Sequence, residues 1–291
     1  MTSYKKPLVG LLGITSILLS SHLYAVDVDA GDYDAATAGT SLALLYLQHN
    51  ERNSLYDNSN KINSNIGLDS NIGILRFVHY TKVNNTLIAP QILIPFGQLE
   101  ENGDLSNAGK RSGLGDIILS TAIWLYNDPV KKEYWGITPY LFVPTGQYDK
   151  DEALNLGENR YKLNLQSGYS KRIAPKLSWD LTGDITFYGD NDKVKTNSKL
   201  EQDMGYQLQT SLRYFADEKF DIRAGLSYQN NGDTKIDNVQ TDAFKQTKFW
   251  VGTGINISPT SQAVLTYGRD LDVKNGFKVD NSLNLRLLYA F

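Results

Sequence analysis

The chain contains no cysteine, so neither a disulfide bond nor thiolate chemistry is available to it. Only three histidines occur in 291 residues, which leaves little material for a histidine-based metal centre. The formal net charge is −3, and a chain without excess positive charge has no electrostatic basis for binding nucleic acid. After residue 25, no apolar run approaches the roughly 20 residues that a membrane-spanning helix needs. The main remaining signal is the alternation of apolar and polar residues.

The first 25 residues have the pattern of a secretory signal peptide. Lys5 and Lys6 precede an apolar run over residues 7–19, and Ala25 supplies a small residue for cleavage. That run is too short for a membrane-spanning helix. We therefore expect residues 1–25 to be removed and residues 26–291 to fold as one domain.

Segments with a period of two recur from end to end of the mature chain. Each is about ten residues long, enough for a tilted transmembrane strand. The clearest cover residues 161–169, 177–187, 204–214 and 220–228, and the weaker ones cover 39–49, 67–80, 85–97, 114–126, 133–146, 246–257 and 262–270. Residues 279–291 complete the set. This pattern predicts an all-β fold, a closed antiparallel transmembrane β-barrel of about 12 strands.

The connections between these segments alternate in length. Short links cover residues 81–85, 127–132, 171–175, 216–219 and 258–261, and long polar links cover 50–66, 98–112, 147–159, 189–199, 230–245 and 270–278. An even-stranded barrel of the bacterial outer membrane has short periplasmic turns and longer extracellular loops in this order. A β-sandwich has no reason to alternate in this way.

The last strand also indicates the outer membrane. Leu287, Tyr289 and Phe291 fall on one apolar face, while Ser282 and Asn284 lie on the opposite face. We interpret the three apolar residues as a C-terminal signal for the barrel-insertion machinery and then as a surface for lipid. Outer-membrane lipid and lipopolysaccharide are the partners that this location implies.

Charged residues alternate with the apolar positions of several predicted strands, which places them on the inner face of the barrel. These candidates for solute selection are Arg160, Lys162, Asp180, Asp184, Arg213, Asp221, Arg223 and Arg286. Opposed charges across a lumen would select solutes. Alternatively, inward charges simply pair and fill a narrow barrel, and at 12 strands the sequence leaves both readings open.

Two of the predicted strands contain prolines, which cannot donate to a strand ladder. Pro90 and Pro95 lie in the third strand, and Pro139 and Pro144 lie in the fifth. One hypothesis is a kink that opens the wall sideways and lets an apolar solute leave into the lipid. The alternative is a set of bulges that only shapes the barrel. We expect Pro95 and Pro144 nearer the outer rim.

A group of short motifs resembles a known family. The motifs are Ile-Pro-Phe-Gly at 94–97, Gly-Leu-Gly-Asp-Ile at 113–117, Val-Pro-Thr-Gly-Gln-Tyr-Asp at 143–149 and Asn-Leu-Gly-Glu-Asn-Arg at 155–160. Together they resemble the bacterial outer-membrane family named for the meta-pathway of phenol degradation. The resemblance implies a transporter-like barrel associated with aromatic catabolism, and it carries over no catalytic or binding residue.

We therefore expect an outer-membrane channel for passive uptake of small aromatic or hydrophobic compounds, without a cofactor and without enzymatic activity. The segment over residues 26–39 is too short for the plug domain of an energy-coupled receptor. One alternative is a lipid-modifying barrel enzyme, for which His49 lies near the outer rim with Ser41 and Ser54 close in sequence. The other is a non-conducting structural or adhesive barrel.

Overall fold

The computed structural model describes residues 27–62, 65–103, 109–195, 198–237 and 239–291. The predicted signal peptide lies outside the described residues. Every regular element in the described part of the chain is a β-strand. Within these residues, no helix is long and apolar enough to span a membrane.

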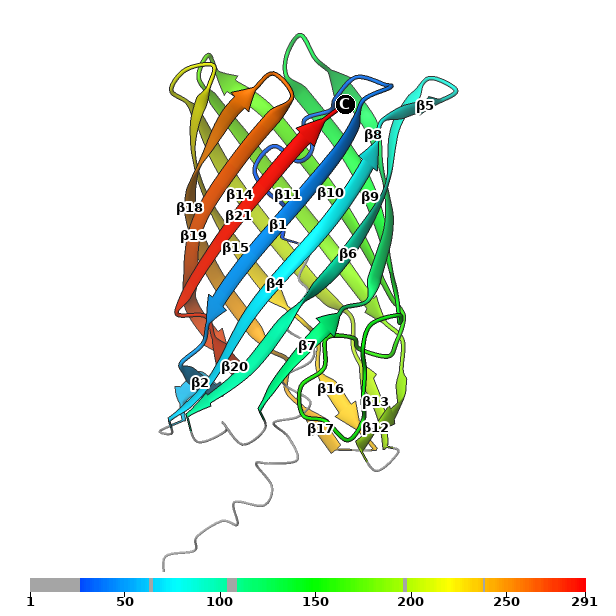
Figure 1. The fold of residues 1–291 in the computed structure, drawn as a ribbon, viewed down its shortest axis with the longest axis vertical. Helices are drawn as coiled ribbons and strands as arrows, with labels where there is room; N and C mark the ends of the chain where they lie inside the picture. The colour runs from blue at the N-terminus through cyan, green and yellow to red at the C-terminus, as the bar shows by residue number, and fades with distance from the viewer. Residues whose placement is uncertain (1–26, 63–64, 104–108, 196–197, 238) are drawn as a thin grey trace, which may run out of the picture.

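Twelve long strands form one closed antiparallel barrel (Figure 1). Neighbours in sequence are neighbours in the wall, β1 pairs with β21, and the further pairing of β4 with β6 completes the ring. The strands are β1 (Ser41–Glu51), β4 (Ile66–His79), β6 (Thr86–Gly103), β8 (Ile117–Asp128), β9 (Glu133–Val143), β10 (Lys162–Ala174), β11 (Leu177–Tyr188), β14 (Gly205–Phe215), β15 (Phe220–Asn230), β18 (Lys245–Ser258), β19 (Ser261–Lys274) and β21 (Asn281–Ala290).

Shorter strands extend the connections between these twelve. Two small sheets lie among the long loops: β2 (Ser54–Asp57), β3 (Asn60–Lys61) and β20 (Gly276–Lys278) form one, and β12 (Asn191–Val194), β13 (Ser198–Gln202), β16 (Thr234–Ile236) and β17 (Val239–Thr241) form the other. β5 (Thr81–Val83) and β7 (Lys110–Leu114) each pair with β6. The sequence did not predict these additions to the loops.

The alternation of exposure along each strand shows which way the side chains face. On β10, Leu163 and Leu165 are exposed, whereas Lys162, Asn164 and Gln166 are buried. Successive side chains of a strand point to opposite faces, so the apolar set covers the outside and the polar set faces the lumen. A soluble protein has the reverse arrangement. An outside of this kind is suited to lipid.

The predicted strand number and the alternation of short and long connections are confirmed. The short turns lie at the end of the barrel where the C-terminus is found, and the long loops with their small sheets lie at the other end (Figure 1). We call these the periplasmic and external ends. Several boundaries differ from the prediction by a few residues. One of them affects a candidate residue: β9 ends at Val143, so Pro144 lies in the external loop and not in the strand.

Candidate functional site

The predicted inward charges lie on a polar half of the inner wall. They come from β10, β11, β14, β15 and β21, and Arg160 lies just before β10. All eight residues are buried, with exposed fractions of 8% or less. Their partners divide them into local pairs, residues without a basic partner, and residues that bind a separate segment of the chain.

The local pairs are ion pairs between residues two or four positions apart in the sequence. Arg160 and Lys162 both bind Glu158, at 2.8 and 2.5 Å, and Arg223 binds Asp221 two residues away at 2.6 Å. No ion pair to Asp180 or Asp184 is found in the described part of the chain; Asp184 accepts a hydrogen bond from the Asn164 amide at 2.7 Å, and Asp180 one from the Ser211 hydroxyl at 3.4 Å.

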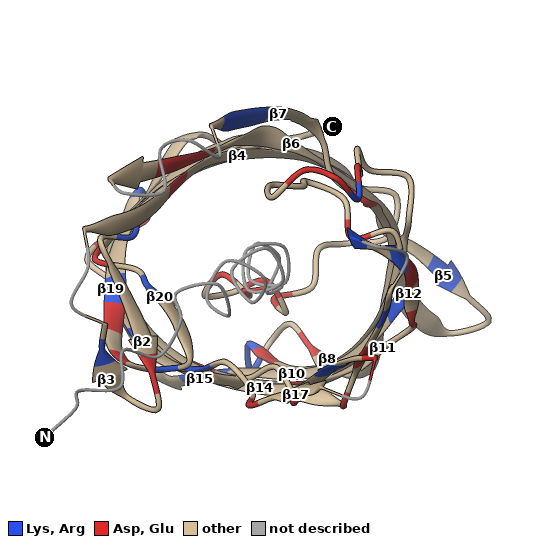
Figure 2. Cartoon of the chain, turned by 90° about the horizontal axis from the view of Figure 1, so that it is seen from below, with Lys and Arg blue, Asp and Glu red and all other residues tan. Residues whose placement is uncertain are grey.

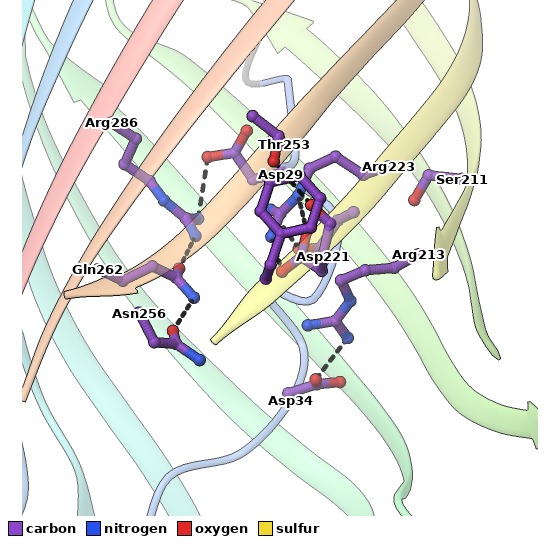
Figure 3. A network of polar contacts seen from close by, with 12 residues as sticks. Asp29, Asp34, Ser211, Arg213, Asp221, Arg223, Thr253, Asn256, Gln262 and Arg286 are labelled. Atoms are coloured by element: carbon purple, nitrogen blue, oxygen red, sulfur yellow. Dashed lines mark hydrogen bonds and ion pairs between the residues drawn. The ribbon is translucent and has the colours of Figure 1, made fainter. Parts of the chain in front are cut away.

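The remaining arginines bind the N-terminal segment, residues 27–40, which runs inside the barrel (dark blue in Figure 1; also visible within the ring in Figure 2). Asp34 binds Arg213 at 2.5 Å, and Asp29 binds Arg286 at 2.9 Å (Figure 3). Two basic residues outside the predicted set take part as well. Asp32 bridges Arg76 and Arg286, Asp27 binds Lys248, and the Ala30 carbonyl accepts a hydrogen bond from Arg223.

A tyrosine anchors the middle of this segment against the wall. The Tyr33 ring lies over Gly136 and Gly168, which face each other on β9 and β10, and a Cβ on Gly168 would overlap the ring. The Tyr33 hydroxyl is within hydrogen-bond distance of Thr138 at 3.0 Å and donates to Gln166 at 3.1 Å. Two glycines on adjacent strands thus form a niche of the ring's size.

Two small cavities lie beside the segment among the described residues. One cavity, of about 60 Å³, lies between the segment and the wall at β1, β18, β19 and β21. A second, of about 10 Å³, lies near Asp180 and Gln209 and has the volume of about one water molecule. An apolar cavity that admits benzene measures on the order of 150 Å³. Neither space admits an aromatic solute while the segment stays in place.

We expected residues 26–39 to be too short for a plug domain. The sequence did not predict that residues 27–40 lie inside the lumen. A short acidic segment can be held in the lumen without a folded domain, because the wall supplies basic side chains that bind it. Its described part carries four aspartates at positions 27, 29, 32 and 34 and no basic residue. That local excess of negative charge beside a barrel rich in inward arginines was the available signal.

The other half of the inner wall is apolar. Three clusters follow one another along it. The mouth cluster at the external end comprises Leu55, Ile66, Leu68, Ile72, Leu99, Leu154, Leu156 and Phe277. The middle cluster comprises Leu93, Ile118, Tyr140 and Phe142, and the periplasmic cluster comprises Leu44, Val78, Tyr80, Leu87, Ala89, Trp124 and Tyr134. Ile74 packs against both the mouth cluster and the middle cluster.

A polar interruption separates the middle and periplasmic clusters. Arg76 donates from Nε to the Gln91 side chain at 2.7 Å and from Nη1 to Tyr46 at 2.9 Å, and the same Nη1 binds Asp32 of the N-terminal segment. Ala35, farther along that segment, packs against the periplasmic cluster. The segment therefore crosses the apolar side of the lumen where the three clusters are interrupted.

Two of the four candidate prolines, Pro90 and Pro139, lie on the strands that flank β8, and Pro144 lies in the external loop. Pro90 faces Thr121 of β8 from one side, and Pro139 lies on the other side, where the β8–β9 pairing omits Thr121 and Ala122. Pro90 and Pro139 point outward. Pro95 points inward, and its carbonyl accepts a hydrogen bond from Gly115, just before β8.

The external loop over residues 144–161 closes the wall beyond the ends of β8 and β9. The carboxylate of Asp116 accepts the backbone N–H of Gly146 and of Glu158, each at 2.9 Å. Gly146 and Gly157 touch through their backbones, and a Cβ on Gly146 would lie 2.7 Å from the Gly157 Cα. This contact explains why the family-like motifs carry glycine and aspartate at these positions: they hold the loop to the barrel.

The remaining candidates lie on the outside or at the rims. His49 contacts Asn71 at 2.8 Å and Glu51 at 3.5 Å, whereas Ser41 contacts His79 at the periplasmic end. Leu287, Tyr289 and Phe291 are exposed on the outer face. Among the described residues, no group of three histidine, aspartate or glutamate side chains could hold a metal ion.

Comparisons with known proteins agree with this architecture. The family model described as "Putative MetA-pathway of phenol degradation" matches residues 52–287. The chain is 38% identical to an outer membrane channel from Pseudomonas putida F1, covering 91% of this chain and 100% of that one, with a TM-score of 0.87. Among curated proteins, no sequence matches the chain.

Two more distant structures share the fold. The transport unit of the Escherichia coli autotransporter AIDA-I is 10% identical, covering 99% of this chain and 100% of that one, with a TM-score of 0.53. A deltaS2S3 mutant of TodX, a monoaromatic hydrocarbon channel, is 9% identical, covering 88% of this chain and 91% of that one, with a TM-score of 0.51. The chain is a β-barrel of the bacterial outer membrane, and it belongs to the family described as "Putative MetA-pathway of phenol degradation".

Proposed function

We propose that this protein is a passive channel for small apolar solutes, aromatic compounds among them. The observation that carries the proposal is the row of apolar clusters along one half of the lumen, opposite the charged half. A lumen for ions or sugars needs no such lining, because polar groups on all sides would solvate those solutes. The family's name and the similarity to an outer membrane channel support the same class of solute.

Passage requires the N-terminal segment to move. Its ion pairs hold it between the middle and periplasmic clusters, and the two cavities beside it in the described part of the chain are smaller than an aromatic solute needs. A shift of Asp32 away from Arg76 would open the apolar half while the barrel wall stays intact. The segment is thus the main barrier that an axial route has to overcome.

A lateral route at β8 is the second part of the proposal. Pro90 and Pro139 flank Thr121, where the ladder between β8 and β9 is interrupted, and both prolines face the lipid. Missing N–H donors weaken the wall at this height. An apolar solute that reaches the middle cluster would find the weakest part of the wall beside it.

A catalytic role is not part of the proposal. His49 is paired with Asn71 and Glu51 on the outer face, and no serine lies within hydrogen-bond distance of it among the described residues. A serine hydrolase needs its nucleophile and base in direct contact. Substituting His49 with Ala is expected to leave uptake unchanged.

Uptake by intact cells tests the proposal, because small apolar solutes cross simple phospholipid bilayers unaided. Cells that express the protein should take up labelled toluene several-fold faster than cells without it. The double variant Pro90→Thr/Pro139→Thr restores two donors in the wall and should lower that uptake if the lateral route operates. Equal uptake with and without the protein would rule out the function, and an unaffected double variant would rule out only the lateral route.

A further inference from the structure

We infer that the mouth cluster contains an anion-recognition site, in which the guanidinium of Arg52 binds the carboxylate of a small apolar solute such as an arene carboxylate. The inference rests on the proposed function, because it names the kind of solute that the mouth selects. None of the predicted selectivity residues belongs to the mouth cluster.

Contacts with β4 hold Arg52 beside the mouth cluster. It follows the end of β1, its carbonyl accepts the N–H of Leu68 at 2.8 Å, and its Nη1 donates to the Ser70 hydroxyl at 3.0 Å. On β4, residues 68, 70 and 72 share the inner face, so Leu68 and Ile72 flank this serine. Leu99 of β6 is the cross-strand partner of Ser70. The guanidinium therefore lies beside apolar side chains of the mouth cluster.

This arginine differs from the other buried ones in having no carboxylate partner. Its exposed fraction is 6%, and in the described part of the chain it takes part in no ion pair. The other buried arginines, Arg160, Arg213, Arg223 and Arg286, each bind a carboxylate. Two carboxylates, those of Asp270 and Asp69, lie near enough to act on its charge, but neither forms an ion pair with it among the described residues. Asp270 accepts hydrogen bonds from the Gln246 amide and the Val279 N–H, and Asp69 accepts one from the Asn102 amide.

The charge on Arg52 remains available to a ligand. Burial lowers the pKa of Arg52 to about 10, which leaves the group protonated at neutral pH. A buried cation without a counter-ion is costly, and a carboxylate that forms two charge-assisted hydrogen bonds would relieve that cost. A neutral arene offers no such compensation.

The space for the apolar part of the solute is now filled by the protein itself. Leu154 and Leu156 of the external loop are 2% and 1% exposed and pack into the mouth cluster. The loop that carries them is tied to the barrel through Asp116 on one side and is open to solvent at its exposed residues. A ring or short chain would displace these two leucines while its carboxylate reaches Arg52.

Glu101 is a nearby carboxylate that would oppose a bound anion, and its replacement supplies a test of opposite sign. Glu101 of β6 faces Leu68, is 4% exposed, and its Oε2 has no hydrogen-bond partner among the described residues. Removing this negative charge should favour a bound carboxylate. Removing Arg52 should do the reverse.

The test is calorimetric binding of benzoate, and of benzyl alcohol as a neutral match, to the folded mature protein. Benzoate should bind at least about tenfold more tightly than benzyl alcohol, since a charge-assisted hydrogen bond is worth about 1.5–3 kcal/mol. Arg52→Gln should abolish this preference without changing benzyl alcohol binding, which also shows that the variant is folded. Glu101→Gln should strengthen benzoate binding.

Arg111→Gln is the matched control, because Arg111 of β7 is partly exposed and already binds two carboxylates, those of Asp149 and Glu152 on the external loop. Equal benzoate affinity in the wild type and Arg52→Gln, no preference for benzoate in the wild type, or an equal loss in the control would each overturn the inference. These outcomes leave the proposed function standing, since it depends on toluene uptake by cells.

Discussion

At the scale of single residues, the position of the N-terminal segment depends on two glycines of the wall, because they leave room for a tyrosine ring. Gly136 and Gly168 face each other on β9 and β10, and the Tyr33 ring occupies the space above them. The hydroxyl of that ring then reaches Thr138 and Gln166 on the same two strands. A tyrosine thus fixes the depth of a segment that has little regular structure of its own.

Filling the niche should release the segment. In Gly168→Val the new side chain overlaps the Tyr33 ring, and the two hydrogen bonds of its hydroxyl, worth about 1 kcal/mol each, are lost. The chain has no cysteine, so Ala30→Cys, at a position 2% exposed, provides a single thiol to report the change. Its reaction with a maleimide should become at least about tenfold faster in the Gly168→Val background.

Gly183 is the control for that experiment. It lies on β11, and a Cβ there would meet only ordinary contacts, the nearest at 3.6 Å. Gly183→Val should leave the thiol as protected as before. If Gly168→Val also leaves it protected, Tyr33 does not hold the segment.

At the scale of elements, the external loop over residues 144–161 is tied to the barrel by two carboxylates. Asp116 accepts two of its backbone N–H groups, and Glu158 binds both Arg160 and Lys162. Burial alone raises the pKa of Glu158, but Lys162 and Arg160 outweigh burial and lower the pKa to about 2. The loop is therefore held partly by a carboxylate that must be ionised.

The stabilisation from Glu158 should disappear in acid. Because its pKa in the folded protein is lowered from the ordinary value of 4.5, its contribution is fully present above about pH 4.5 and is lost as the pH falls toward 2. At neutral pH, Glu158→Gln leaves two buried cations unpaired, which costs roughly 3 kcal/mol or more. Hydrogen exchange of the backbone amides at positions 146 and 158 should thus be faster in the variant than in the wild type at pH 7.

The difference in amide exchange rate between the wild type and Glu158→Gln should decrease as the pH falls from 4.5 to 2. Glu152→Gln, at an exposed position of the same loop that binds Arg111, should show no such window. A difference that stays constant with pH would mean that Glu158 is not ionised in the folded loop.

At the scale of the whole molecule, the strands and their order could be predicted and the contents of the lumen could not. Alternation along segments such as 161–169 and 204–214 is a local property, and the connection lengths give the topology. The partners of the inward arginines are distant in sequence: Arg213 binds Asp34 and Arg286 binds Asp29. A period of two indicates that such residues face inward, but it does not indicate what they meet there.

The apolar half of the lumen escaped prediction for a related reason. Leu93, Ile118 and Phe142 face inward, yet they alternate with equally apolar outward residues, so β6, β8 and β9 show little contrast between their faces. Strands that are apolar on both sides reveal no direction by periodicity. When neighbouring strands of a barrel are apolar on both faces, this pattern itself indicates that the lumen wall is apolar there.

Planar-bilayer conductance is the most direct measurement of the central claim, that the N-terminal segment closes an otherwise open barrel. The mature protein should be compared with a variant that lacks residues 27–36 and retains 37–40, which connect to β1. We predict rare or very small conductance steps for the complete protein and sustained ohmic steps for the deletion. Equal conductance in the two proteins, or silence from the deletion when it is demonstrably folded, would contradict the account.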